Sequence, residues 1–219
     1  RRSKDSGYQI WEDLPEIRGV LAALGWDEFT LVGHSRGAII ASLLASTMPE
    51  RVKRLVLLDA VAPQAMPEAD IVRQLRKYLI DKEQMLGRTG RVFTTVKEAV
   101  AARVERGLTE EAAALIAHRN LRECPGGYTW TTDPRLFGAS SIKLTQRQVQ
   151  AVLEALTMPV LVLLASDGLG AHPEVEEQAR QSIAGLTLER VDGDHHFHMG
   201  DDAPLVAARI RQFMEDGQL

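Results

Sequence analysis

A chain of 219 residues is long enough to bury a substantial core, and it fits one domain with or without an insertion. Its 45% hydrophobic and 26% charged residues exclude a disordered or fibrous protein, and a formal net charge of −4 gives no reason to expect nucleic acid as a partner. No apolar run is long enough to span a membrane, and the first ten residues lack the apolar core of a signal peptide, so no membrane partner is expected. The single cysteine, Cys124, excludes an internal disulfide framework and favours a cytoplasmic location.

A helix and two strands are predicted first along the chain. Apolar residues at helical spacing follow Asp13, which has capping-box spacing with Glu16, and Gly25 supplies a left-handed stop. Apolar runs at 29–33 and 54–59 predict buried strands. Their near-continuous Val and Leu content favours a parallel sheet that is covered on both faces.

The stretch 63–156 differs from the rest, because it carries helical patterns and no convincing strand. Threonines at N-cap positions are expected to open three of its helices: Thr95, Thr109 and Thr145, the last with Gln148 at capping-box spacing. We therefore predict a helical cap inserted at 63–156 between two parts of an α/β core, 1–62 and 157–219.

Two further apolar runs follow the insertion, at 159–165 and 186–191, and predict strands of the same sheet. A final amphipathic helix carries Val206, Ile210 and Phe213 on one face. Two strands, a helical insertion and two more strands form the order of an α/β sheet with a lid between two of its strands.

The motif Gly33-His34-Ser35-Arg36-Gly37 lies between a predicted strand and a predicted helix. A sharp turn there holds the serine in a strained conformation that exposes its hydroxyl, and the two glycines avoid clashes. The backbone N–H of Arg36 lies at the helix start, where it can stabilise an oxyanion. We interpret Ser35 as a nucleophile rather than a small residue at a glycine-rich turn, and His34 as a candidate substrate-binding residue.

Three histidines follow the last predicted strand: His195, His196 and His198. A serine nucleophile needs a histidine to accept its proton and a carboxylate to orient that histidine. A metal site is the alternative for three histidines in four residues. The sequence contains no HExxH or CxxC pattern to complete a zinc site, so we predict no metal and no cofactor.

Two aspartates compete for the role of the acid, and each ends or follows a predicted strand. Asp167 follows the run at 159–165 and Asp59 ends the run at 54–59, so either gives the chain order Ser, Asp, His. Capping of the next turn is an alternative for both. We favour Asp167, because its strand immediately precedes the strand of the histidines, and keep Asp59 as the alternative acid.

Three segments together resemble the α/β-hydrolase family over essentially the whole chain: LVGHSRGAIIASLLASTMPERVKRLVLLD, PVLVLLASDG and VDGDHHFHM. The stretch YTWTTDPRL at 128–136 resembles the serine hydrolase-like esterase branch, whose members carry W-x-x-D-P-R at the end of a helical cap. The resemblance implies an α/β-hydrolase fold, with a mostly parallel sheet flanked by helices and an inserted helical cap. It also implies Ser35 as nucleophile, Asp167 as acid and His195 as base.

This resemblance departs at the beginning of the chain. Members of the family open with further strands and a His-Gly-type loop that gives a second oxyanion N–H, whereas RRSKDSGYQIWEDL resembles the region just after that loop. We therefore expect the N-terminal strands to be absent from this chain. A separate N-terminal segment that completes the sheet is then an expected partner.

These predictions favour a serine hydrolase that cleaves a small-molecule ester through an acyl-enzyme on Ser35. Acyl transfer, thioester cleavage and carbon–carbon bond hydrolysis use the same triad. A truncated or degenerate hydrolase acting as a non-catalytic binding module is the alternative from another class. Aromatic and aliphatic residues of the predicted cap fit an apolar acyl or alcohol group, with Trp130 as a candidate substrate-binding residue.

Overall fold

The computed structural model describes residues 8–85 and 87–216. These residues form two compact units. The sheet unit contains residues 10–68 and 143–216, and the inserted unit contains residues 8–9 and 69–142. Within the described residues, no helix combines the length and the apolar character that a membrane crossing requires.

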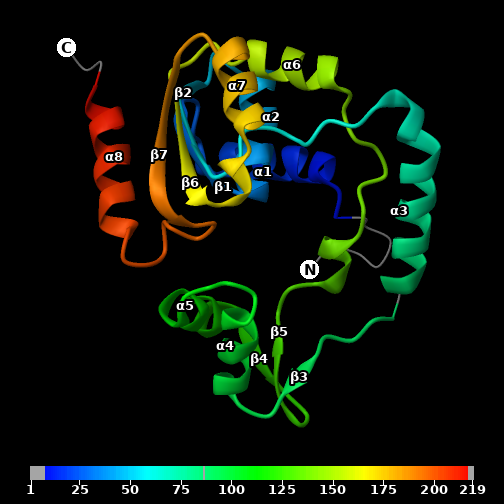
Figure 1. The fold of residues 1–219 in the computed structure, drawn as a ribbon. Coiled ribbons are helices and arrows are strands. Elements are labelled where there is room, and N and C mark those ends of the chain that lie inside the picture. The colour runs from blue at the N-terminus through cyan, green and yellow to red at the C-terminus, as the bar shows by residue number, and fades with distance from the viewer. Residues whose placement is uncertain (1–7, 86, 217–219) are drawn as a thin grey trace. The chain divides into compact units, whose positions relative to one another are not determined.

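The sheet unit is built on four parallel strands in the order β1-β2-β6-β7 (Figure 1). Their bounds are Phe29–His34 for β1, Val52–Leu58 for β2, Val160–Asp167 for β6 and Leu186–Asp194 for β7. All four predicted strands are therefore confirmed, with ends that shift by a few residues. The α/β class and the parallel sheet flanked by helices are confirmed with them.

Helices cover both faces of this sheet: α1 (Ile10–Leu24), α2 (Arg36–Thr47), α6 (Gln146–Glu154), α7 (Pro173–Ser182) and α8 (Ala203–Glu215). Leu55 and Leu57 of β2 pack into the core shared with the first four helices, whereas Val56 packs on the face covered by α8 (Figure 1). Successive strand residues point to opposite faces, so a strand buried on both sides needs apolar residues at every position.

The inserted unit contains α3 (Ile71–Met85), α4 (Val96–Val104), α5 (Glu110–Asn120) and a short antiparallel sheet in the order β3-β5-β4. The strands are β3 (Val92–Phe93), β4 (Leu121–Cys124) and β5 (Gly127–Trp130). The expectation of an insertion without strands is therefore wrong. Strands of two to four residues are too short to show an alternating pattern in the sequence.

Three helix ends test the predicted start and stop signals. Thr95 and Thr109 accept the backbone N–H of Glu98 and Ala112 at 3.2 Å each, which confirms both N-caps. Gly25 has φ 67° directly after α1 and confirms the left-handed stop. The capping box expected from Asp13 is wrong, because α1 begins earlier, at Ile10.

Helix α6 lies in the predicted insertion but packs in the sheet unit. Its Val149 and Leu153 are buried in the core shared with α2, and the sheet unit resumes at residue 143 rather than at the expected 157. Its start is the capping box expected at Thr145. The Thr145 hydroxyl accepts the Gln148 N–H at 3.3 Å, and the Gln148 side chain accepts the Thr145 N–H at 2.9 Å.

Removing this capping box should destabilise the sheet unit by a small, measurable amount. Thr145→Ala leaves the backbone N–H of Gln148 without its side-chain acceptor and should lower the free energy of unfolding by about 1 kcal/mol. Thr145→Ser keeps the accepting oxygen and is the matched control. Urea unfolding of the intact protein measures both, and equal stability of the alanine variant and the wild type would contradict the expectation.

Candidate active site

Ser35 occupies a strained turn between β1 and α2. Its φ of 54° and ψ of −122° lie outside the helical and extended regions, and a positive φ is uncommon for a residue other than glycine. Its backbone N–H donates to the Leu58 carbonyl at 3.0 Å, which ties the turn to β2. Arg36 is the first residue of α2, so its backbone N–H belongs to the positive end of the helix dipole.

The two glycines of the turn differ in what they do. A Cβ added to Gly33 would collide with the backbone carbonyl of Gly37, so no larger residue fits there without a shift of the helix. An added Cβ at Gly37 would meet no atom within 4 Å. The expected steric requirement therefore holds at Gly33 and not at Gly37.

A chain of hydrogen bonds joins Ser35, His195 and Asp59. His195 Nε2 lies 2.8 Å from Ser35 Oγ, and His195 Nδ1 lies 2.5 Å from Asp59 Oδ2. Each residue directly follows a strand, β1, β7 and β2 respectively. Because the carboxylate only accepts, Nδ1 carries the hydrogen and leaves Nε2 free to accept the serine proton.

Asp59 is fully buried and is held by more than the histidine. Its carboxylate accepts the backbone N–H groups of Ala165 at 3.1 Å, Leu169 at 2.8 Å and Gly170 at 3.1 Å. Burial alone would raise the pKa of Asp59. The hydrogen bonds from His195 and these N–H groups lower it by more than burial raises it, so the pKa lies below its ordinary value. The carboxylate therefore stays ionised in a dry environment.

The preference for Asp167 as the acid is corrected by this geometry. Asp167 is exposed at the end of β6 and lies opposite Asp194 in the strand register, whereas Asp59 contacts His195. The loop that Asp167 begins has another task, because it supplies two of the N–H groups that bind Asp59. A Cβ added to Gly168 would collide with the Asp59 carboxylate, so this close approach requires glycine.

His34 contacts the same histidine from the serine side. Its Nε2 donates to the His195 carbonyl oxygen at 2.7 Å, and its ring centroid lies 4.6 Å from that of His195. Burial, the largest effect, and the neighbouring imidazoles lower the pKa of His34 from 6.5 to about 4, although the bond to the carbonyl raises it. His34 is neutral at pH 7, and it positions the His195 main chain.

The other two histidines of the cluster pack around this arrangement. The rings of His34 and His198 are 4.1 Å apart between centroids, and the His196 N–H donates to Asp194 Oδ1. Burial and the neighbouring imidazoles also lower the pKa of His198. Across the described ranges, no three His, Cys, Asp or Glu side chains are grouped to hold a metal ion.

Two remaining candidates have contacts of their own. The Arg36 side chain pairs with Asp13 of α1 at 2.7 Å. Trp130 lies on β5 of the inserted unit, where the Arg103 guanidinium stacks over its ring at 4.4 Å from the centroid. Its role in substrate binding stays a prediction.

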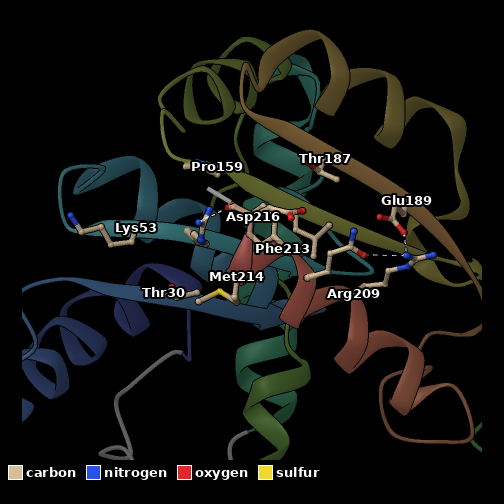
Figure 2. A pocket seen from close by; sticks show the side chains of 12 residues that line it. Thr30, Lys53, Pro159, Thr187, Glu189, Arg209, Phe213, Met214 and Asp216 are labelled. Carbon is tan, nitrogen blue, oxygen red and sulfur yellow. Dashed lines mark hydrogen bonds and ion pairs between the residues drawn. The ribbon is translucent and has the colours of Figure 1, made fainter. Parts of the chain in front are cut away.

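A cavity of about 760 Å³ in the sheet unit lies at the opposite ends of the same strands (Figure 2). Residues from the first positions of the strands line it, among them Thr30 and Thr187, together with side chains of α8. Its arginines are already paired, Arg54 with the Asp216 carbonyl at 2.7 Å and Arg209 with Glu189 at 3.0 Å. The hydrogen-bonded chain lies at the other ends of these strands, so this cavity is not part of it.

Comparison with known proteins identifies a family and several similar proteins. The sequence pattern of the family described as alpha/beta hydrolase fold matches residues 1–202. A serine hydrolase-like protein of Danio rerio is 29% identical over 211 residues, covering 91% of this chain and 64% of the relative. One of Dictyostelium discoideum is 25% identical over 219 residues, covering 92% and 59%. This chain therefore spans about three fifths of the length of these two curated relatives.

A solved structure is similar over nearly all of the chain. The crystal structure of a hypothetical protein from Pseudomonas aeruginosa PAO1 has a TM-score of 0.89 and 32% sequence identity. The match covers 98% of this chain and 76% of that one.

Replacing the buried carboxylate should remove most of the reactivity of Ser35, whereas replacing the exposed one should not. Asp59→Asn no longer holds the imidazole in the tautomer that accepts a proton at Nε2, so we expect labelling of Ser35 by a fluorophosphonate to slow by about 10³–10⁴-fold. Asp167→Asn is the matched control and should label at the wild-type rate. The reverse order of the two variants would restore Asp167 as the acid.

We expect His34 to affect the reactivity of Ser35 through the hydrogen bond that it donates rather than through a positive charge. His34→Phe leaves the His195 carbonyl without that donor, and we expect labelling to slow roughly tenfold. His34→Gln keeps an N–H donor and should recover most of the rate. Because His34 is already neutral, the pH profiles of wild type and His34→Gln should coincide between pH 6 and 8. A profile shifted in the glutamine variant would show that His34 titrates in this range.

Proposed function

The chain belongs to the alpha/beta hydrolase fold family, and from this premise we propose that it is a serine hydrolase that cleaves a carboxylic ester through an acyl-enzyme on Ser35. The single observation that carries the proposal is the hydrogen-bonded chain from Ser35 through His195 to Asp59. A serine hydroxyl at its free pKa is a weak nucleophile, and such a chain activates it. The serine hydrolase-like relatives support the same reaction class.

In the acylation half, Ser35 Oγ attacks the ester carbonyl carbon while its proton passes to His195 Nε2. The carbonyl electron pair moves to the oxygen, and the Arg36 backbone N–H stabilises the resulting oxyanion. The bond to the alcohol then breaks, and His195 gives its proton to the leaving oxygen. The acyl group remains bound to Ser35.

In the deacylation half, water attacks the acyl carbon and gives a proton to His195. The bond to Ser35 Oγ breaks, the proton returns to the serine, and a carboxylic acid leaves. Asp59 keeps the imidazole in one tautomer in both halves and stabilises its protonated form. The lowered pKa of the Asp59 carboxyl supports this role, because an ionised partner is needed each time His195 becomes positive.

A partner strand beside β1 is part of this proposal. Among the described residues β1 pairs with β2 alone, and Val32 of β1 is 55% exposed, whereas Val56 and Val162 of the two central strands are fully buried. An unpaired strand edge is a template for another strand. We place a separate N-terminal segment there, carrying the second oxyanion donor, whose loss typically costs about 10²–10³-fold in rate.

The substrate in this proposal is a small-molecule ester, with no metal or cofactor taking part. Cys124 is a free cysteine, half-buried on β4, which supports a reducing cytoplasmic setting. Apolar side chains of the inserted unit support an apolar acyl or alcohol group, with Trp130 as one contact.

Labelling of the intact protein by a fluorophosphonate tests the proposal. The wild type should react covalently at Ser35, Ser35→Ala should not react, and Ser46→Ala on the same helix α2 should react as the wild type does. A folded wild-type protein that fails to react would leave the binding-module alternative as the better account. Equal labelling of Ser35→Ala would place the nucleophile elsewhere.

Analysis of the reaction products then identifies the reaction type. Hydrolysis of p-nitrophenyl esters of increasing chain length should give the acid, and an added alcohol should not be acylated. Faster turnover of matched thioesters, or transfer to the alcohol, would replace ester hydrolysis by thioester cleavage or acyl transfer.

A further inference from the structure

The inserted unit holds a cavity of about 580 Å³ whose lining is strongly basic. Its charged residues are Arg88, Arg91, Arg103, Arg106 and Glu105, and its aromatic residues are Phe93, Trp130 and Phe137. Four guanidinium groups therefore face a single carboxylate. All of these residues belong to the inserted unit, so the cavity is complete within it.

Arg103 is the most constrained of the four. It lies in the last turn of α4, its guanidinium stacks over the Trp130 ring at 4.4 Å, and its buried Nε has no hydrogen-bond partner among the described residues. Burial and the nearby charge of Arg106 lower the pKa of Arg103. Burial and the charge of Arg106 therefore destabilise the positive charge of Arg103, and a bound anion would stabilise it.

The four arginines also lack the acidic partners that Arg36, Arg135 and Arg180 have. In residues 8–85 and 87–216, no ion pair or side-chain hydrogen bond joins any of them to a carboxylate, and Arg91 instead stacks on Phe93 at 4.7 Å. By contrast, Arg209 of the sheet-unit cavity pairs with Glu189 (Figure 2). The charge in the inserted unit is therefore available to a ligand.

We propose that this cavity binds a multiply charged, phosphate-bearing small molecule. Guanidinium groups present planar, paired donors that match the oxygens of a phosphate, and several of them are needed to balance more than one negative charge. The Trp130 and Phe137 rings in the lining offer apolar surface to the organic part of such a ligand. The site shares Trp130 with the proposed ester contacts but contains none of Ser35, His195 and Asp59, so binding there does not require the esterase reaction.

Calorimetric titration of the intact protein with inorganic pyrophosphate tests this site, at an ionic strength held constant with potassium chloride. Saturable binding is expected, and Arg103→Gln should weaken it roughly tenfold or more. The double variant Arg88→Gln/Arg106→Gln changes exposed side chains only, so it should fold normally and also bind more weakly. Arg119→Gln, an exposed arginine of α5 outside the cavity, should bind as the wild type does.

Tryptophan fluorescence gives a second measurement, because Arg103 stacks on the indole ring of Trp130. Pyrophosphate should change the tryptophan fluorescence of the wild type, and Trp130→Phe should abolish that change while the other two tryptophans remain. Non-saturable binding, or equal affinity in the arginine variants, would overturn the proposal. Tighter binding of citrate than of pyrophosphate would overturn the phosphate class. Loss of fluorophosphonate labelling would leave these titrations unaffected, so the two proposals fail separately.

Discussion

The buried carboxylate of Asp59 is the interaction on which the arrangement of the site depends. It lies at the end of β2 and binds backbone N–H groups from the end of β6 and from the loop after it, while its remaining contact is the imidazole that follows β7. Groups at or just after the ends of three neighbouring strands therefore meet at the carboxylate of Asp59. An ionised carboxylate without water needs this number of donors, because an unpaired buried charge is very costly. The same bonds that keep Asp59 charged therefore also set the position of His195 relative to Ser35.

The sequence was sufficient for the four strands of the sheet unit and for singling out Ser35 and His195, because each leaves a local signal. A buried parallel strand requires a continuous apolar run, and Ser35 lies in a five-residue motif at a strand end. The choice between Asp59 and Asp167 has no local signal, since both follow strands of one sheet. What separates them is the path of the loop with Gly168 and Gly170, which turns its N–H groups toward Asp59. In retrospect the two glycines flanking Leu169 are the trace of this close approach.

Other features could not be predicted from the sequence, for related reasons. Strand β3 is defined by its pairing with β5, which lies farther along the chain, and Arg122 and Glu123 give β4 no apolar alternation. Asp13 has the spacing of a cap, but tertiary structure uses it to pair with Arg36 and starts the helix earlier. His34 belongs to the serine motif, yet its contact with the His195 carbonyl spans 161 residues of sequence. Spacing alone predicts what a residue does for its own element, and not what it does for a distant one.

Two neighbouring strands of this protein end in the same kind of kink, with φ 54° at Ser35 and φ 52° at Asp59. Glycine would adopt either conformation without strain, so the backbone alone would favour glycine at both positions. Their consequences differ, because glycine at 59 would leave three N–H donors facing an empty space, whereas glycine at 35 would give up little beyond one side-chain contact. Selection for thermal robustness alone would thus retain the aspartate and discard the serine. The hydroxyl at position 35 is thus the part of this kinked edge that the stability of the fold does not explain.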